Sequence, residues 1–201
     1  MSEPLIALVD MDNTLCDYHG TLTRDLDAIR SPGEPPTDYQ YDASPLHIRE
    51  RARIIRRQPD WWFNLPPIPS GFAVLELLKK YDYELHILSR SPWSTPNGAG
   101  EKIRWAQKHR REAKITLSDD KSLVEGAILF DDWPEYVLPW LEKHPNGLVL
   151  MPACPWNKDC KHNRIVRFEP NELDKVEAAL HQRQEWRNVV LKVEAKEGNG
   201  H

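Results

Sequence analysis

The stretch Leu5-Ile6-Ala7-Leu8-Val9-Asp10-Met11-Asp12-Asn13-Thr14 decides how the rest of the chain is interpreted. Its first five residues are all apolar and lack helical spacing, so they predict a short strand that is buried on both faces. Two carboxylates, Asp10 and Asp12, follow at the carboxyl end of this strand, which is where ligands bind in an open parallel sheet. Because Asp and Asn also suit tight turns, a solvated turn is the alternative interpretation.

Further apolar runs alternate with segments of helical periodicity, which predicts an α/β fold with a Rossmann-like parallel sheet and helices on both faces. We expect strands at residues 84–88, 114–117, 127–130 and 148–151, and helices that include residues 72–78, 100–109 and 171–187. Residues 1–15 and 69–190 would form this core. Residues 191–201 are charged and contain glycine, so we expect a flexible tail there.

Residues 16–68 interrupt the alternation with a polar stretch that is Pro-rich at residues 31–36. The stretch is too long for an ordinary loop, so we interpret it as an inserted, mainly helical cap, with helices at about 21–30 and 46–57. The second of these is rich in arginine: Arg49, Arg51, Arg53, Arg56 and Arg57. A solvated helix face is the first interpretation, and the alternative is that one arginine reaches a phosphate.

The composition is typical of a compact enzyme. With 201 residues, 40% of them hydrophobic, the chain can bury a sizeable core. A net charge of -4 argues against a protein that coats a nucleic-acid polymer or an anionic membrane. No apolar run approaches the roughly 18 residues of a membrane span, and the N-terminus lacks the pattern of a signal peptide. We therefore expect a cytoplasmic protein.

The three cysteines are an odd number, which favours reduced thiols over a disulfide framework. Cys154, Cys160 and His162 lie close enough in sequence to suggest a metal clip. A structural zinc site normally needs a fourth ligand, and none is obvious beside them. A polar loop is therefore the first interpretation of this segment.

Polar residues also follow the later predicted strands. Ser89 ends the second strand, Lys121 precedes the fourth, and Asp131-Asp132 follow it. Two carboxylates about 4 Å apart repel by roughly 4 kcal/mol at an effective dielectric constant near 20. Gathering four at one sheet edge therefore calls for a divalent cation, and oxygen ligands beside a phosphate favour Mg²⁺. The predicted metal ligands are Asp10, Asp12, Asp131 and Asp132.

These residue types suit phosphoryl transfer. Asp10 can attack phosphorus and form an aspartyl-phosphate that water then hydrolyses. Asp12 can protonate the leaving alkoxide and later deprotonate the attacking water. Lys121 would balance the negative charge, and the Ser89 hydroxyl would bind phosphate oxygens. Taken singly, Lys121 and Ser89 are better interpreted as an ordinary surface lysine and a strand-end serine.

Together these segments resemble the four motifs of the haloacid dehalogenase superfamily, in the right order. The closest resemblance is to the 5'(3')-deoxyribonucleotidases. Three longer stretches carry it: Trp61-Trp62-Phe63-Asn64-Leu65-Pro66-Pro67-Ile68-Pro69, Leu117-Ser118-Asp119-Asp120-Lys121-Ser122-Leu123-Val124 and Ile128-Leu129-Phe130-Asp131-Asp132-Trp133-Pro134. The resemblance runs from about residue 4 to 157 and is weak within the cap.

The resemblance implies specific roles. Mg²⁺ would be held by the Asp10 carboxylate, the Asp12 main-chain carbonyl and one carboxylate of Asp131-Asp132, of which we favour Asp132. Where family members commonly have Thr-Ser-Pro, this chain has Ser89-Arg90-Ser91-Pro92. Aligning on the strand makes Ser89 the phosphate-binding residue, whereas aligning on Ser-Pro makes it Arg90. We prefer Ser89.

Family members also use aromatic side chains of the cap to sandwich the base. The candidates for such a substrate pocket here are Tyr39, Tyr41, Trp61 and Trp62. These rings could instead pack between cap and core, which is the favoured interpretation for the two tryptophans.

The expected function is therefore hydrolysis of deoxyribonucleoside or ribonucleoside monophosphates by a Mg²⁺-dependent phosphatase. Two alternatives are a phosphatase of the same superfamily acting on another small phosphomonoester, and a catalytically silent nucleotide-binding protein. The presence of both Asp10 and Asp12 argues against the silent protein. The resemblance also implies a homodimer, because members of the family often dimerise.

Overall fold

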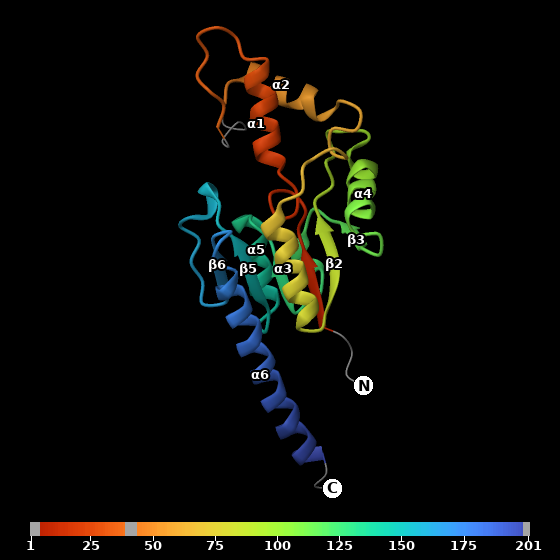
Figure 1. Ribbon diagram of the computed structural model, residues 1–201, viewed down its shortest axis with the longest axis vertical. Helices are drawn as coiled ribbons and strands as arrows, with labels where there is room; N and C mark the ends of the chain where they lie inside the picture. Colours follow the sequence, from red (N-terminus) through yellow and green to blue (C-terminus); the bar gives the residue numbers. More distant parts are fainter. Residues whose placement is uncertain (1–4, 39–43, 199–201) are drawn as a thin grey trace.

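The computed structural model describes residues 5–38 and 44–198, with side chains as far as residue 188. Six parallel strands form one sheet in the order β3-β2-β1-β4-β5-β6 (Figure 1). The strands are β1 (Leu5–Val9), β2 (Tyr83–Ser89), β3 (Lys114–Leu117), β4 (Ile128–Phe130), β5 (Leu148–Pro152) and β6 (Ile165–Phe168). The α/β class expected from the alternating pattern is confirmed. Among the described helices, none is long and apolar enough to cross a membrane.

Helices cover both faces of the sheet because successive side chains of a strand point to opposite faces. Ala7 and Val9 belong to the core cluster that includes α3 (Pro69–Lys80), α4 (Gly98–His109) and α6 (Leu173–Gly198). Leu8 belongs to the cluster formed with α5 (Pro134–Lys143). Both faces of β1 are therefore buried, as five consecutive apolar residues predict.

Several elements differ from the expectation, among them α5, which was not one of the expected helices. Strand β6 pairs with β5 at the edge of the sheet; it was not expected, although three of its four residues are apolar. Helix α6 continues to Gly198 instead of ending near residue 187, so residues 191–198, which were expected to belong to a flexible tail, are helical. Neither Gly nor Pro occurs between residues 173 and 197, so nothing in this stretch stops a helix.

Residues 16–68 contain α1 (Tyr18–Ala28) and α2 (Leu46–Arg56), which lie beyond the carboxyl ends of the strands (Figure 1). The two ends of this segment lie side by side, because the Asp17 amide donates to the Pro66 carbonyl (2.8 Å) and the Ile68 amide donates to the Leu15 carbonyl (2.8 Å). The chain thus leaves the sheet after β1 and returns at the same place, where α3 begins.

Candidate active site

The segment after β1 folds into a tight loop that places Asp10 inside the protein. The Asp10 amide donates to the Phe130 carbonyl of β4 (2.8 Å), and the Leu15 and Cys16 amides both donate to the Met11 carbonyl. Asn13 has a φ of 56°, a left-handed conformation that asparagine tolerates. The segment is therefore a turn, but Asp10 is only 5% exposed, so it is not the solvated turn of the alternative interpretation.

A glycine in α3 lets that helix approach this loop. A Cβ atom on Gly71 would lie 2.1 Å from the Thr14 carbonyl oxygen, a distance that no real side chain tolerates. Only glycine therefore allows the first turn of α3 to pack directly against the loop that carries the two carboxylates.

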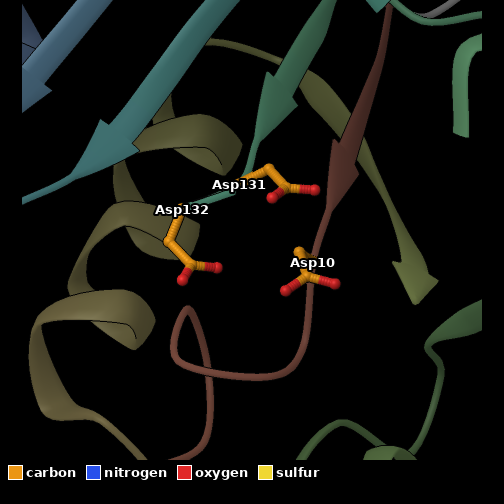
Figure 2. Close-up of side chains that lie close together, drawn as sticks. All are labelled: Asp10, Asp131 and Asp132. Atoms are coloured by element: carbon orange, nitrogen blue, oxygen red, sulfur yellow. The ribbon is translucent and has the colours of Figure 1, made fainter. Parts of the chain in front are cut away.

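Three carboxylates converge where β1 and β4 end (Figure 2). Asp10, Asp131 and Asp132 each offer an oxygen, and these oxygens lie within 4.8 Å of one another. Burial and the neighbouring carboxylates raise the pKa of Asp10 to about 7, although Lys121 opposes the rise. The same causes raise the pKa of Asp132 well above its ordinary value. The cluster is short of positive charge, and its all-oxygen donor set fits a hard divalent cation.

Lys121 is the cation that the structure places within this cluster. It lies in a short 3₁₀ helix, η2 (Lys121–Leu123), and is 1% exposed. Its Nζ donates to Asp10 Oδ1 (2.6 Å) and to Asp131 Oδ2 (2.5 Å). Burial lowers the pKa of Lys121, but the attraction of the two carboxylates is greater and raises it overall. Lys121 therefore stays charged and links the ends of β1 and β4.

The two adjacent aspartates differ in their surroundings. Asp131 accepts from Lys121 through Oδ2 and from the Trp133 amide through Oδ1 (2.9 Å). Asp132 accepts from the Thr14 hydroxyl (3.3 Å) and from Trp156 Nε1 (2.9 Å), and its side chain lines the cleft described next. Of the two, Asp132 is therefore the one that faces the space where a ligand can enter.

A cleft of about 500 Å³ opens above these carboxylates. It is lined by Asp10, Asp12, Asn13, Tyr18, His19, Arg56, Trp62, Arg90, Ser91, Pro92, Trp93, Ser94, Thr95, Lys102, Asp132, Trp133, Glu135 and Tyr136. The strand ends supply the acidic floor, while α1, α2 and the segment that returns from α2 (residues 57–68) supply aromatic and basic walls. The dimensions suit a small ligand.

The predicted phosphate-binding and substrate-pocket residues are only partly gathered in this cleft. Arg90 lines it and pairs with Asp119 (3.1 Å), whereas Ser89 is fully buried and its hydroxyl accepts from Lys102. Trp62 lines the cleft, but Trp61 does not; the Nε1 of Trp61 donates to Asp25 (2.7 Å). Tyr39 and Tyr41 lie outside the described residues.

One arginine of α2 reaches the cleft; the alternative drawn from the sequence was that one of these arginines reaches a phosphate. Arg56 lines it and donates to the Tyr18 hydroxyl (3.0 Å). Others in this helix are engaged elsewhere: Arg51 pairs with Glu34, and Arg53 pairs with Glu50. The predicted solvated face thus describes only part of the helix.

Lys102 is the main site residue that the sequence did not reveal. It lies in α4, is 1% exposed, and its Nζ donates to Asp12 Oδ2 (2.6 Å), to Ser89 Oγ (3.0 Å) and to the Arg90 carbonyl (2.9 Å). No motif surrounds it in the sequence. The one available signal was a lysine on the helix that follows the predicted phosphate-binding residues Ser89 and Arg90.

A second unpredicted group is aromatic. Trp156, in the short helix η3 (Pro155–Asn157), donates to Asp132, and its ring lies 4.6 Å from that of His19. Asn157 Nδ2 donates to the Asp132 carbonyl (2.9 Å). This loop therefore holds Asp132 from both its side chain and its main chain, and the sequence had suggested only a polar loop or a metal clip here.

The metal clip of Cys154, Cys160 and His162 is not formed. Among the described residues, the group of His, Cys, Asp and Glu side chains close enough to share an ion consists of Asp10, Asp131 and Asp132. His162 instead accepts from the Arg164 amide (3.1 Å). Spacing in sequence did not translate into proximity in this loop.

Comparison with known proteins points to one family. The model of the family described as 5' nucleotidase, deoxy (pyrimidine), cytosolic type C protein matches residues 4–172. A putative 5'(3')-deoxyribonucleotidase of Bordetella bronchiseptica is 30% identical over 168 residues, which cover 77% of this chain and 87% of that protein. The mitochondrial 5'(3')-deoxyribonucleotidase of Mus musculus is 27% identical over 184 residues, 84% of this chain and 79% of that protein.

Solved structures agree on the fold. The HAD family hydrolase of Deinococcus radiodurans, solved with bound phosphate and sodium, has a TM-score of 0.53 at 13% identity and covers 90% of this chain and 98% of its own. A hydrolase from Pseudomonas syringae has a TM-score of 0.51 at 12% identity and covers 85% of this chain and 96% of its own. With the match to residues 4–172, this chain belongs to the family of the 5' nucleotidase, deoxy (pyrimidine), cytosolic type C protein.

Proposed function

We propose that this protein is a Mg²⁺-dependent phosphatase that hydrolyses nucleoside monophosphates through an aspartyl-phosphate on Asp10. The observation that carries the proposal is the buried group of Asp10, Asp131 and Asp132, in which Lys121 bridges Asp10 and Asp131 and from which Asp10 and Asp132 line a cleft. Membership of a family whose relatives are named deoxyribonucleotidases supports the substrate class.

The charges support a divalent cation. Counted as ionised, the carboxylates of Asp10, Asp12, Asp131 and Asp132 exceed the two ammonium groups of Lys102 and Lys121 by two negative charges. The ligands we propose are the Asp10 carboxylate, the Asp12 main-chain carbonyl and the Asp132 carboxylate. Bound there, Mg²⁺ would neutralise this excess and polarise a phosphoryl oxygen.

The proposed reaction has two steps. In the first, an Asp10 carboxylate oxygen forms a bond to phosphorus as the bond to the leaving oxygen breaks, and Asp12 gives its proton to that oxygen. In the second, Asp12 takes a proton from water, which attacks the phosphoryl group, releases inorganic phosphate and restores the Asp10 carboxylate. Lys121 and Lys102 supply positive charge beside the transferred group in both steps.

The segment 16–68 would act as a cap over this chemistry. Its residues Tyr18, His19, Arg56 and Trp62 line the same cleft as Asp10. A flat base could stack against aromatic rings there, and such stacking tolerates any base. This placement supports a phosphate ester that bears a flat aromatic base as the substrate, in preference to a sugar phosphate without a base.

The test of the proposed function is phosphate release from a panel of substrates. We expect release from 5'- or 3'-monophosphates of deoxyribonucleosides, with ribonucleotides and sugar phosphates as comparisons, each with Mg²⁺ and with a chelator. Strong release from a sugar phosphate alongside little release from every nucleotide would contradict the proposal. Nucleotide binding without any phosphate release would instead identify a catalytically silent protein.

Lys102→Met is expected to lower kcat/KM by roughly 10²- to 10³-fold, the range for removing one preorganised electrostatic contact. The variant deletes the cation that holds Asp12, Ser89 and the Arg90 carbonyl. Steady-state kinetics measure the effect. Lys108→Met is the matched control, because Lys108 lies in the same helix but is exposed. Wild-type kinetics in Lys102→Met would remove Lys102 from the proposed site.

A further inference from the structure

Glu101 is a buried carboxylate that takes no part in the acidic cluster. It lies in α4 and is 3% exposed. Its Oε1 accepts from the Asp60 amide (2.9 Å), and its Oε2 accepts from the Trp62 amide (3.1 Å). Hydrogen bonds from amides to a carboxylate are stronger than those between neutral groups, so this side chain fastens the segment that returns from α2 to the core.

That segment has a reason to need fastening. Asp60 has a φ of 62°, a left-handed conformation that costs conformational energy for a residue with a Cβ atom. The strained residue lies in the segment between the end of α2 at Arg56 and Trp62. Without an acceptor for both amides, the buried Trp62 amide and the part-buried Asp60 amide would lose their partner, and the strain would favour rearrangement of the loop.

Glu101 and Lys102 are consecutive, and together they join the two walls of the cleft. Lys102 holds the side of the cleft next to β1 and β2 through Asp12, Ser89 and the Arg90 carbonyl. Glu101 holds the backbone of Trp62, whose ring stacks on Tyr18 (5.1 Å between centroids, 17° between planes) and lies 4.7 Å from Lys102 Nζ. The position of the Trp62 ring therefore depends on Glu101, whereas Lys102 keeps three oxygen partners of its own.

We propose that Glu101 is a positioning residue that sets the place of the Trp62 wall, the side of the cleft lined by Trp62, and thereby the preference for substrates that carry an aromatic base. Glu101 does not line the cleft; it acts through the two backbone amides. The inference rests on the proposed function, since a preference for esters with an aromatic base has meaning only if the cleft binds them.

The test separates recognition of the base from recognition of the phosphate. Glu101→Gln keeps the shape of the side chain but replaces one acceptor oxygen with an NH₂ group that cannot accept an amide hydrogen. Stacking of a base on an aromatic side chain contributes roughly tenfold to hundredfold in affinity, so we expect KM for a deoxyribonucleoside monophosphate to rise about tenfold. We expect kcat to change by less than about threefold, and the inhibition constant of inorganic phosphate by less than about twofold.

Two further variants give the result its meaning. Glu101→Asp keeps both acceptor oxygens, so its KM should lie between that of Glu101→Gln and that of the wild-type protein. Arg104→Gln removes an exposed ion pair to the Asp60 side chain but leaves the amide contacts, so KM should stay at the wild-type value. A rise in KM as large in Arg104→Gln as in Glu101→Gln would overturn the assignment to Glu101.

The possible failures are distinguishable. Wild-type protein that releases no phosphate from nucleotides would overturn the proposed function and this inference with it. If the wild-type protein is active, either of two results in Glu101→Gln would overturn this inference alone. One is an unchanged KM for the nucleotide, and the other is a rise in the inhibition constant of inorganic phosphate as large as the rise in KM. If circular dichroism shows that Glu101→Gln does not fold, Glu101→Asp replaces it in the test. A ratio of nucleotide KM to the inhibition constant of inorganic phosphate that is the same in Glu101→Asp as in the wild-type protein then overturns the inference.

Discussion

Asp10→Asn is expected to lower turnover by about 10⁴-fold or more, because the amide that replaces the carboxylate is no nucleophile. The fold should survive the change. The contact that joins residue 10 to β4 is made by its backbone amide with the Phe130 carbonyl, and Lys121 keeps its second partner, Asp131. Removing one of three crowded carboxylates also relieves their repulsion, so the thermal midpoint of the metal-free protein should stay or rise.

The measurement is phosphate release by wild-type and variant protein with the preferred substrate, together with circular dichroism and thermal unfolding. Asp82→Asn is a matched control, because it makes the same change just before β2, at the opposite end of the sheet, and asparagine tolerates the left-handed φ of 60° found there. Turnover that persists in a folded Asp10→Asn variant would contradict the aspartyl-phosphate mechanism.

Removal of divalent metal is expected to abolish activity, and Mg²⁺ should restore it. The physical reason is the excess of negative charge on the cleft floor, where Asp10 and Asp132 would both need to approach a phosphate that is itself negative. Because the metal binds the folded protein only, saturating Mg²⁺ should also raise the thermal midpoint, with a stabilisation of about 2.7 kcal/mol at a concentration of one hundred times Kd.

A comparison of two single variants, Asp132→Asn and Asp131→Asn, tests which carboxylate binds the metal. Substitution of a group outside the ligand sphere typically costs 10- to 100-fold in metal affinity, so we expect Asp132→Asn to raise the Mg²⁺ concentration for half-maximal activity by more than about 100-fold. Asp131→Asn should raise it less, because Asp131 is engaged by Lys121 and the Trp133 amide. The opposite order would assign the metal to Asp131, and full activity of wild-type protein in chelator would contradict metal dependence altogether.

Much of the site could be predicted because parallel strands bring their carboxyl ends to one edge. Asp10 and Asp131 are 121 positions apart in the chain, yet each directly follows an apolar run, and the pairing of β1 with β4 makes them neighbours. Lys121 was predicted from its motif, and the structure places its Nζ between these two carboxylates. For the carboxylates, a local pattern together with a rule of sheet geometry was enough, whereas Lys121 depended on its place among the family's motifs.

Strand β6 and the full length of α6 were missed although the sequence carries a local signal for both. Three of the four residues of β6 are apolar, and no Gly or Pro interrupts α6 before Gly198. Trp156 reaches Asp132 from a loop that the sequence described only as polar. The contact between them arises where the chain turns back after β5, and no spacing rule predicts such a contact.

By itself, the sequence determined the α/β fold and the group of acidic residues with their lysine. Buried strands need continuous apolar runs, and the residues that follow those runs must meet at one edge. Only the tertiary structure decided that Asp132 faces the cleft, that Lys102 holds Asp12, and that Glu101 fastens the Trp62 wall. These are contacts between side chains and segments far apart in the chain. They depend on how α4 packs against the segment that returns from α2, and no local pattern in the sequence predicts that packing.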